Sequence, residues 1–291
     1  ITLRGGCKLA QVEALLAQQR QMFGFEPPCF GEDATIGGMV AAGLAGPRRA
    51  YAGSIRDFVL GVKLLDGRGQ VLQFGGRVIK NVAGFDVSRL MVGALGTLGI
   101  ILEVSIRVVP QFETEITLAF EHASADEHIR WVNRLGSEPY PISASLWSDG
   151  HSLLRLSGSE QGVGQASAQL GGEKIESDWS QVKEQRLDFF DRAQPLSRIS
   201  LPPTTSDLLP DTSQLIEWGG ARRWLCGDAD IAAVRDQIAG AGGSLCAFRR
   251  HAPDVPRFHP LAAAMLTLQR NLKSSFDPAG IFNPGKLYPG L

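Results

Sequence analysis

Two groups of closely spaced glycines are the residues of this chain best suited to chemistry. The first is Gly37-Gly38, which follows Thr35-Ile36, and the second consists of Gly93, Gly96 and Gly99. Glycine tolerates positive φ and has no Cβ, so main-chain amides beside it can lie against a ligand. Successive exposed amides at the head of a short helix bind anions. The spacing therefore predicts an anion site held mainly by the backbone.

The glycine spacing does not fit the two common phosphate-binding motifs. A dinucleotide-binding Rossmann loop needs G-x-G-x-x-G after a strand and before a helix. Here the second group has a glycine at every third residue and precedes the β-branched run of residues 100–109, and no Walker A motif is present. Each group alone also fits a tight turn in an ordinary sheet. The ordered polar stretch of residues 75–86 between the two groups favours a ligand site.

The composition is that of an ordinary globular protein. The 291 residues are 44% hydrophobic and 20% charged, and the net charge is −1. This balance gives no reason to expect nucleic acid or an anionic membrane as a partner. The sequence shows no signal peptide and no apolar run long enough to span a bilayer. The basic pairs Arg48-Arg49 and Arg222-Arg223 are expected to be solvated surface pairs.

The cysteines and histidines do not have metal-site spacing. The four cysteines are far apart and form no C-x-x-C, so no iron–sulfur or structural zinc site is expected, and the thiols are interpreted as reduced thiols of a cytosolic protein. The histidines form neither H-x-H nor H-E-x-x-H, so each is predicted to be a lone surface residue and no metal is expected. They are His122, His128, His151, His251 and His259.

The elements that must position the glycines can be placed by residue pattern. Residues 8–21 carry apolar residues at helical spacing. Residues 57–65 and 71–74 are expected to form a hairpin that turns at Asp66-Gly67, and residues 100–109 a buried strand. After residue 112 the pattern changes to that of an α+β unit with two ββα-like halves. Its predicted strands are 114–120, 143–147, 152–156, 198–201 and 223–225, and its predicted helices are 125–135, 163–170 and 231–241.

Four segments of the chain resemble a known family. The resemblance rests on the runs ATIGGMVAAGLAGPRRAYAGSIRDFVLGVKLL and FGGRVIKNVAGFDVSRLMVGALGTLGIILEV, on residues 216–224 and on residues 276–286. These segments are similar to the vanillyl-alcohol oxidase (PCMH-type) FAD-binding superfamily, and within it to the FAD-binding E subunits of bacterial glycolate oxidase. The resemblance covers nearly the whole chain.

The resemblance implies an α+β fold in three parts. Residues 1–112 would be the second lobe of a PCMH-type FAD-binding domain, and residues 113–260 an α+β cap domain for substrate or partner. Residues 261–291 would be a C-terminal helix and tail that return to the FAD-binding domain. The chain opens on the strand-like Ile1–Arg4 without Met, so we expect a preceding first lobe with another phosphate-contacting loop. We therefore expect weak or absent FAD binding by these 291 residues and FAD binding by the intact protein.

The resemblance also implies nine contacts to FAD. Residues 35–38 would contact the pyrophosphate, and Gly43 would allow close packing behind that loop. Ser54 would lie near the phosphates or the ribityl chain, and the remaining three would border the ribityl and adenosine portions. The nine residues are Thr35, Ile36, Gly37, Gly38, Gly43, Ser54, Gly96, Gly99 and Ile101.

Catalytic residues are less clearly indicated. A guanidinium can pair with a substrate carboxylate, so Arg223 is a candidate beside Arg198 and Arg222, although a salt bridge or a solvated face explains these residues equally simply. Lys286 lies in the tail and could neutralise charge on a reduced flavin, or it could belong to a structural staple with Asn283. Arg223 and Lys286 are the two candidate catalytic residues, and the sequence does not identify the catalytic residues themselves.

We therefore expect an FAD-dependent 2-hydroxy-acid oxidoreductase that acts as a subunit. The resemblance implies two partners, a second FAD subunit carrying the hydroxy-acid site and an iron–sulfur subunit. It implies a cytoplasmic location, with peripheral association at the inner membrane through these partners. Two alternatives stay open: a stand-alone dehydrogenase for another 2-hydroxy acid such as D-lactate, and a non-catalytic assembly subunit with a vestigial flavin fold.

Overall fold

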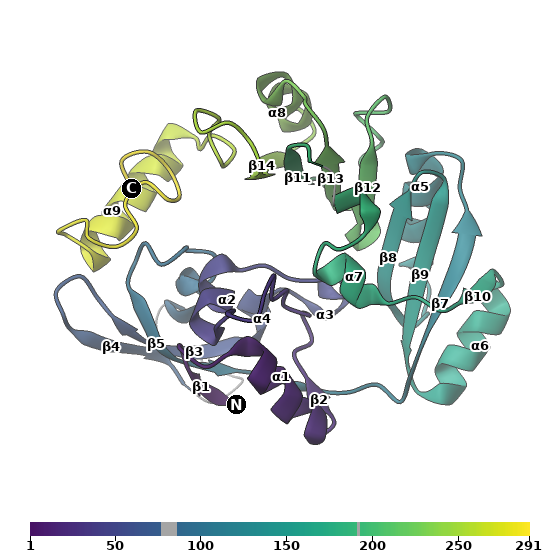
Figure 1. Ribbon diagram of the computed structural model, residues 1–291, viewed down its shortest axis with the longest axis horizontal. Helices are drawn as coiled ribbons and strands as arrows, with labels where there is room; N and C mark the ends of the chain where they lie inside the picture. The colour runs from purple at the N-terminus through teal and green to yellow at the C-terminus, as the bar shows by residue number, and fades with distance from the viewer. Residues whose placement is uncertain (77–85, 191–192) are drawn as a thin grey trace. The chain divides into compact units, whose positions relative to one another are not determined.

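The computed structural model describes residues 1–76, 86–190 and 193–291, and shows two compact units (Figure 1). The first comprises residues 1–46, 53–111 and 260–291. The second comprises residues 112–259 together with the short segment 47–52. The inclusion of residues 47–52 in the second unit was not anticipated from sequence. Among the described residues, no helix combines the length and apolar character needed to cross a bilayer.

The first unit is built on a four-stranded antiparallel sheet in the order β1-β5-β3-β4. The expected Asp-Gly hairpin is confirmed, because β3 pairs with β4 and the carboxylate of buried Asp66 accepts bonds from the amides of Arg68 (2.9 Å) and Gln70 (2.8 Å). A separate strand pair joins β2 to β6. The strands are β1 (Thr2–Arg4), β2 (Gln21–Met22), β3 (Val59–Leu65), β4 (Val71–Gly75), β5 (Ile100–Ile106) and β6 (Val109–Pro110).

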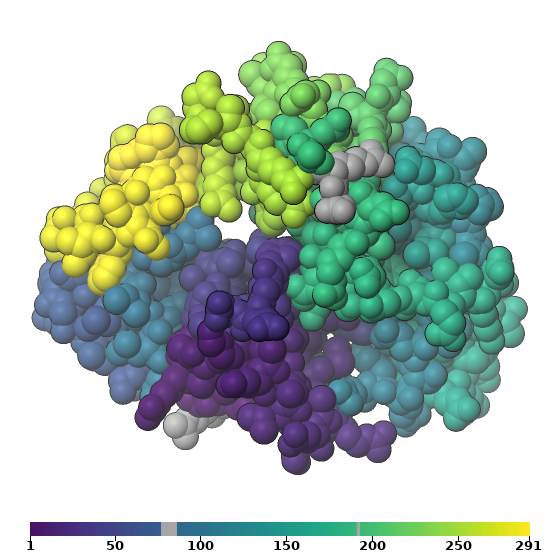
Figure 2. Space-filling model, in the orientation of Figure 1, coloured from purple at the N-terminus to yellow at the C-terminus, as the bar shows by residue number. Residues whose placement is uncertain are grey.

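The helices of the first unit are short except for the first and the last. The first buries Leu9, Val12 and Leu16, whose spacing puts them on one face. The last is largely exposed, and of its residues only Lys273 is buried. Figure 2 shows the last helix together with the tail that follows it at the yellow end of the colour bar. The helices are α1 (Leu9–Gln18), α2 (Ile36–Ala42), α4 (Ile55–Phe58), the 3-10 turn η1 (Ser88–Met91) and α9 (Ala263–Phe276). Residues 77–85, part of the polar stretch noted between the glycine groups, lie outside the described residues.

The second unit contains one eight-stranded antiparallel sheet in the order β10-β7-β9-β8-β12-β13-β11-β14. The pairing of β8 with β12 joins the two expected halves into this single sheet. The strands are β7 (Thr114–Glu121), β8 (Ile142–Ser148), β9 (His151–Gly158), β10 (Glu173–Ile175), β11 (Leu196–Ser200), β12 (Gln214–Glu217), β13 (Arg222–Cys226) and β14 (Ser244–Arg249).

Each face of this sheet packs on its own helices. Leu118 packs in a cluster with α5 and α6, and Leu225 in one with α8. On the opposite face, Trp224 packs with Trp179 of α7 and with Phe190. Alternate residues along each strand therefore serve different clusters, as a pleated sheet requires. The helices are α3 (Arg49–Ala52), α5 (Ala125–Leu135), α6 (Glu160–Leu170), α7 (Trp179–Lys183) and α8 (Ile231–Ala239), with 3-10 turns η2 (Asp188–Phe190) and η3 (Trp218–Gly220).

The prediction that every histidine is a surface residue is wrong for His128, which is fully buried in α5. Its Nδ1 lies 2.8 Å from the hydroxyl oxygen of Ser152, and Nδ1 of His122 lies 2.8 Å from the same atom. Burial, assisted by the neighbouring His122, lowers the pKa of His128 to about 3. The histidine at position 128 is therefore neutral in the folded protein at physiological pH.

This burial predicts a pH dependence of stability. Because the pKa of His128 is about 3 in the folded state, against an ordinary value of 6.5, the unfolded state binds the extra proton between these values. The free energy of unfolding should therefore fall by on the order of a few kcal/mol as the pH is lowered from 6.5 towards 3. Denaturant titrations of His128→Gln should show a flatter pH dependence than the parent. The exposed His151→Gln is the control, and equal slopes for both variants would contradict the prediction.

Candidate functional site

The first glycine group forms the start of α2 and lies against the loop that follows β1. The amide of Ile36 donates to the carbonyl of Cys7 (2.9 Å), and the amide of Gly37 donates to the carbonyl of Gly5 (2.7 Å). A Cβ on Gly37 would lie only 3.0 Å from that carbonyl oxygen. The hydroxyl of Thr35 caps the helix by accepting from the amide of Gly38 (3.1 Å). The sequence folds this way because glycine allows the two backbones to touch.

The second glycine group lies against the end of the same helix. The amides of Gly93 and Leu95 donate to the carbonyls of Val40 (3.1 Å) and Ala41 (2.9 Å), which α2 leaves without helical partners. Gly43 ends α2 in the left-handed conformation, with φ of 64°. A Cβ on Gly43 would lie 2.9 Å from the amide nitrogen of Gly93. One short helix thus brings together two glycine groups that are more than fifty residues apart in sequence.

A cavity of about 520 Å³ opens between these loops within the first unit. Its volume falls in the range of small-molecule and cofactor sites. Six of the residues that line it are glycines, and the others include the polar residues Thr35 and Asn283 and several aliphatic residues. It is lined by Gly5, Gly6, Thr35, Gly37, Gly38, Ala41, Leu95, Gly96, Gly99, Ile100, Ile101, Ile281, Phe282 and Asn283.

Six of the nine residues predicted to contact a cofactor line this cavity: Thr35, Gly37, Gly38, Gly96, Gly99 and Ile101. The other three do not. Ile36 is fully buried, and Gly43 lies behind the wall against Gly93. Ser54 instead caps α4, where its amide and hydroxyl donate to the carboxylate of Asp57 at 2.8 and 2.9 Å.

The amides that are available to a ligand in the structure differ from those predicted from the sequence. The amides of Ile36, Gly37 and Gly38 already donate to protein oxygens, as described above. Within the described residues, no hydrogen bond engages the amides of Gly6 and Gly96, and both residues line the cavity. A Cβ on Gly6 would meet no atom within 4 Å, so the space beside it is open. Anion-binding amides are therefore better sought at Gly6 and Gly96 than along α2.

Sequence reasoning missed the Gly5-Gly6 pair, and although it expected the tail to return to this domain, it did not include Asn283 among the residues that contact the cofactor. Gly5-Gly6 directly follows the expected first strand, so a glycine pair at a strand end was the available signal. The tail enters through Asn283, whose Nδ2 donates to the carbonyl of Leu95 (2.7 Å). A Cβ on Gly96 would lie 2.9 Å from that same nitrogen. The tail thus closes one side of the cavity over the second glycine group.

Lys273 holds this tail in place. Its ammonium donates to the carbonyls of Thr97 (2.7 Å) and Phe282 (2.6 Å) and to the carboxylate of Asp277 (2.6 Å). Burial opposes ionisation of Asp277, but the hydrogen bonds from Lys273 and from the amides of Phe282 and Ile281 outweigh it and lower the pKa of Asp277. This buried pair joins α9, the tail and the second glycine group.

The two catalytic candidates lie elsewhere. Nε, Nη1 and Nη2 of Arg223 donate to the carbonyls of Gly220 (3.2 Å), Ser206 (3.0 Å) and Thr205, and only 1% of the residue is exposed. Arg223 therefore braces the loops beside β13 in the second unit. Lys286 is exposed in the tail and does not line the cavity.

The cavity fits a phosphate-bearing cofactor with an aromatic ring system. Open main-chain amides and the Thr35 hydroxyl suit phosphate oxygens, while Ile100, Ile101 and Ile281 supply an apolar wall. Glycines keep the wall free of side chains. The residues present thus fit a flavin dinucleotide better than a purely polar ligand.

Comparison with known proteins defines the class. Residues 1–75 match the FAD binding domain family, and residues 231–287 match the C-terminal domain of FAD linked oxidases. A solved structure of alkyldihydroxyacetonephosphate synthase shares the fold, with a TM-score of 0.68 at 16% identity over 98% of this chain and 64% of that one. The protein is therefore of the FAD-linked oxidase class, with FAD as its cofactor.

Similarity to a curated relative identifies the family of this chain within the FAD-linked oxidase class. The chain is 44% identical over 292 residues to glycolate oxidase subunit GlcE of Escherichia coli, covering 100% of this chain and 82% of that protein. It belongs to this family. Partial matches are D-lactate dehydrogenase of Archaeoglobus fulgidus (31% identity, 43% of this chain, 28% of that protein) and glycolate oxidase subunit GlcD of Bacillus subtilis (39% identity, 34% of this chain, 21% of that protein).

Filling the open space beside Gly6 should weaken cofactor binding without destabilising the fold. In Gly6→Val the new side chain meets no protein atom within 4 Å of its Cβ but occupies the cavity. We expect the FAD affinity of the intact protein to fall at least about tenfold. Flavin fluorescence titration measures the affinity, and thermal unfolding of the apoprotein should be unchanged. Gly164→Val, at an open position in α6, is the control and should leave FAD affinity unchanged.

Breaking the buried pair of the tail should destabilise the protein. Lys273→Met leaves the Asp277 carboxylate buried without its counter-charge, which should cost about 3–5 kcal/mol in chemical denaturation. Adding Asp277→Asn to this variant should recover part of the loss. Lys286→Met, an exposed lysine of the same tail, is expected to change stability by no more than about 0.5 kcal/mol. Equal effects of the two lysine substitutions would contradict the role assigned to Lys273.

Proposed function

We propose that this chain is the FAD-binding subunit of a complex that oxidises glycolate to glyoxylate. The observation that carries the proposal is the 44% identity to glycolate oxidase subunit GlcE along the whole chain. The glycine-lined cavity supports it, since its wall fits the cofactor that the class requires. D-Lactate dehydrogenase is less well supported, because that similarity covers 43% of this chain.

Oxidation of a 2-hydroxy acid needs an acceptor for the hydrogen on the α-carbon, a base for the hydroxyl proton and a cation for the carboxylate. Bound FAD supplies the acceptor. The amides of Gly6 and Gly96 and the hydroxyl of Thr35 would hold its phosphate oxygens, and the tail would limit access of water at Asn283. Lys273 acts indirectly by fixing that tail.

The proposal includes partner subunits. Glycolate oxidase subunit GlcD of Bacillus subtilis is similar over part of this chain, so a related flavoprotein is a fitting second subunit that carries the hydroxy-acid site. We further propose an iron–sulfur subunit as the electron acceptor, because the four cysteines of this chain lie far apart in sequence and form no C-x-x-C motif of the kind that holds a cluster. A cytoplasmic location, with peripheral association at the inner membrane through the partners, completes the proposal.

Reconstitution tests the proposal. The complete protein should carry about one FAD per chain by absorbance after purification. Alone it should oxidise neither glycolate nor D-lactate at a substantial rate, and with the second flavoprotein and the iron–sulfur subunit it should support reduction of an artificial electron acceptor by glycolate. Turnover of D-lactate by the isolated protein would favour a stand-alone dehydrogenase. A flavin-free protein in an active complex would favour an assembly subunit.

A further inference from the structure

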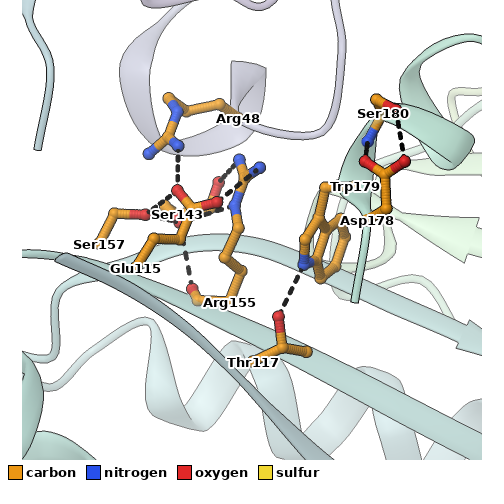
Figure 3. Close-up of polar contacts among 9 residues, drawn as sticks. All are labelled: Arg48, Glu115, Thr117, Ser143, Arg155, Ser157, Asp178, Trp179 and Ser180. Atoms are coloured by element: carbon orange, nitrogen blue, oxygen red, sulfur yellow. Dashed lines mark hydrogen bonds and ion pairs between the residues drawn. The ribbon is translucent and has the colours of Figure 1, made fainter. Parts of the chain in front are cut away.

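The arginine pair Arg48-Arg49 does not have the solvated setting expected from sequence. Only 4% of Arg48 is exposed, and its Nη2 donates to the carboxylate of Glu115 at 2.7 Å. Figure 3 shows this contact, together with the buried Arg155 and the hydroxyl of Ser157, which donates to the same carboxylate at 2.7 Å. Arg48 thus belongs to a polar cluster on the sheet of the second unit, and its neighbour Arg49 is carried to that unit with it.

Arg49 approaches a second cluster of arginines at the other end of the sheet. Its guanidinium carbon lies 4.5 Å from the ring centroid of Trp218, and that of Arg222 lies 3.7 Å from the same centroid. Trp218 has a φ of 58°, a left-handed conformation that is uncommon for a bulky side chain. One indole ring therefore contacts two cations.

Arg198 joins this cluster through strand register. In the β11–β13 pair Arg198 lies opposite Trp224, and Arg222 lies two residues before Trp224, so the two arginines are diagonal neighbours on one face. The guanidinium carbon of Arg198 lies 5.8 Å from the ring centroid of Phe248. Aromatic rings thus flank Arg49, Arg198 and Arg222, which we call the arginine cluster.

The arginine cluster is short of negative charge. Glu217, 1% exposed, pairs with Arg222 and also accepts from the indole nitrogen of Trp224 (2.9 Å). Within the part of the chain that the structure describes, no hydrogen bond or ion pair engages the guanidinium group of Arg49 or Arg198. Burial lowers the pKa of Arg222 to about 10, the pair with Glu217 opposes this lowering, and repulsion from Arg198 and Arg49 adds a smaller part to it.

Partly buried cations without a counter-charge are costly unless a ligand supplies one. Arg49 and Arg198 are both half-buried, so solvent and a small ligand can still reach them. Aromatic rings lie beside their guanidinium groups, which leaves nitrogen-bearing edges to pair with an acceptor. A carboxylate matches such an edge with two parallel hydrogen bonds.

We propose that Arg49 and Arg198 bind a small carboxylate, with Arg222 fixed by Glu217 as a third cation. The proposal deepens the proposed function, on which it rests for the choice of a 2-hydroxy acid or its 2-oxo product as the natural ligand. This site would bind that ligand without oxidising it, because the second flavoprotein carries the oxidation site. Within the arginine cluster, Arg222 has a structural role through its ion pair with Glu217. The guanidinium groups of Arg49 and Arg198 contact water in the free protein and would contact the carboxylate when it binds.

Isothermal titration of the full chain with oxalate, a carboxylate that cannot be oxidised at an α-carbon, tests this site. Oxalate should bind, and Arg49→Gln and Arg198→Gln should each weaken its binding at least about tenfold. Arg198→Lys should recover part of the loss, because it restores the charge without the planar fork. Arg130→Gln, an exposed arginine of α5, makes the same change in charge and should leave oxalate affinity unchanged.

Unchanged oxalate affinity in Arg49→Gln and Arg198→Gln would overturn the proposal, as would equally tight binding of inorganic phosphate. Near-ultraviolet circular dichroism verifies that each variant is folded, and Arg49→Gln tests the site by itself if Arg198→Gln fails to fold. FAD content measured on the same samples separates the two proposals. Bound FAD without oxalate binding contradicts this inference alone, whereas oxalate binding without FAD contradicts the proposed cofactor role alone.

Discussion

Direct contact of backbone with backbone is the constraint on which the first unit depends. A Cβ on Gly5 would lie 2.1 Å from the carbonyl oxygen of Ile101, and one on Gly43 would lie 2.9 Å from the amide of Gly93. Because these positions have no side chains, the β1 loop, α2 and the second glycine group can share hydrogen bonds and still leave a cavity between them. The absence of side chains at these positions therefore both allows the close packing of this unit and leaves room for the cofactor cavity.

Local pattern was enough to predict much of this architecture. The Asp-Gly hairpin, the helix at residues 125–135 and the two glycine groups were all found from residue type and spacing, since each is encoded within a few residues. Strand β12 and the pairing that joins β8 to it were not found, because the partner strand is nearly seventy residues away. Glycine spacing identified the cavity wall but not which amides the protein itself would occupy.

Charged residues were the hardest to interpret from sequence. Lys286 and Lys273 both lie near the C-terminus, and only the fold shows that Lys273 is surrounded by three oxygen acceptors. Arg223 and Arg198 are similar in sequence context, yet one is held by three carbonyls and the other faces an aromatic ring. Burial and partner are properties of the three-dimensional neighbourhood, which a charge pattern along one chain does not encode.

The insertion of residues 47–52 into the second unit has a genetic consequence. The chain passes between the units at four points, so no single uninterrupted stretch of the gene encodes the second unit. An excised fragment of residues 112–259 would lack Arg48 and leave the carboxylate of Glu115 without one of its cations. Recombination that exchanges the second unit between related proteins would have to transfer this six-residue segment as well, which ties the evolution of the two units to each other.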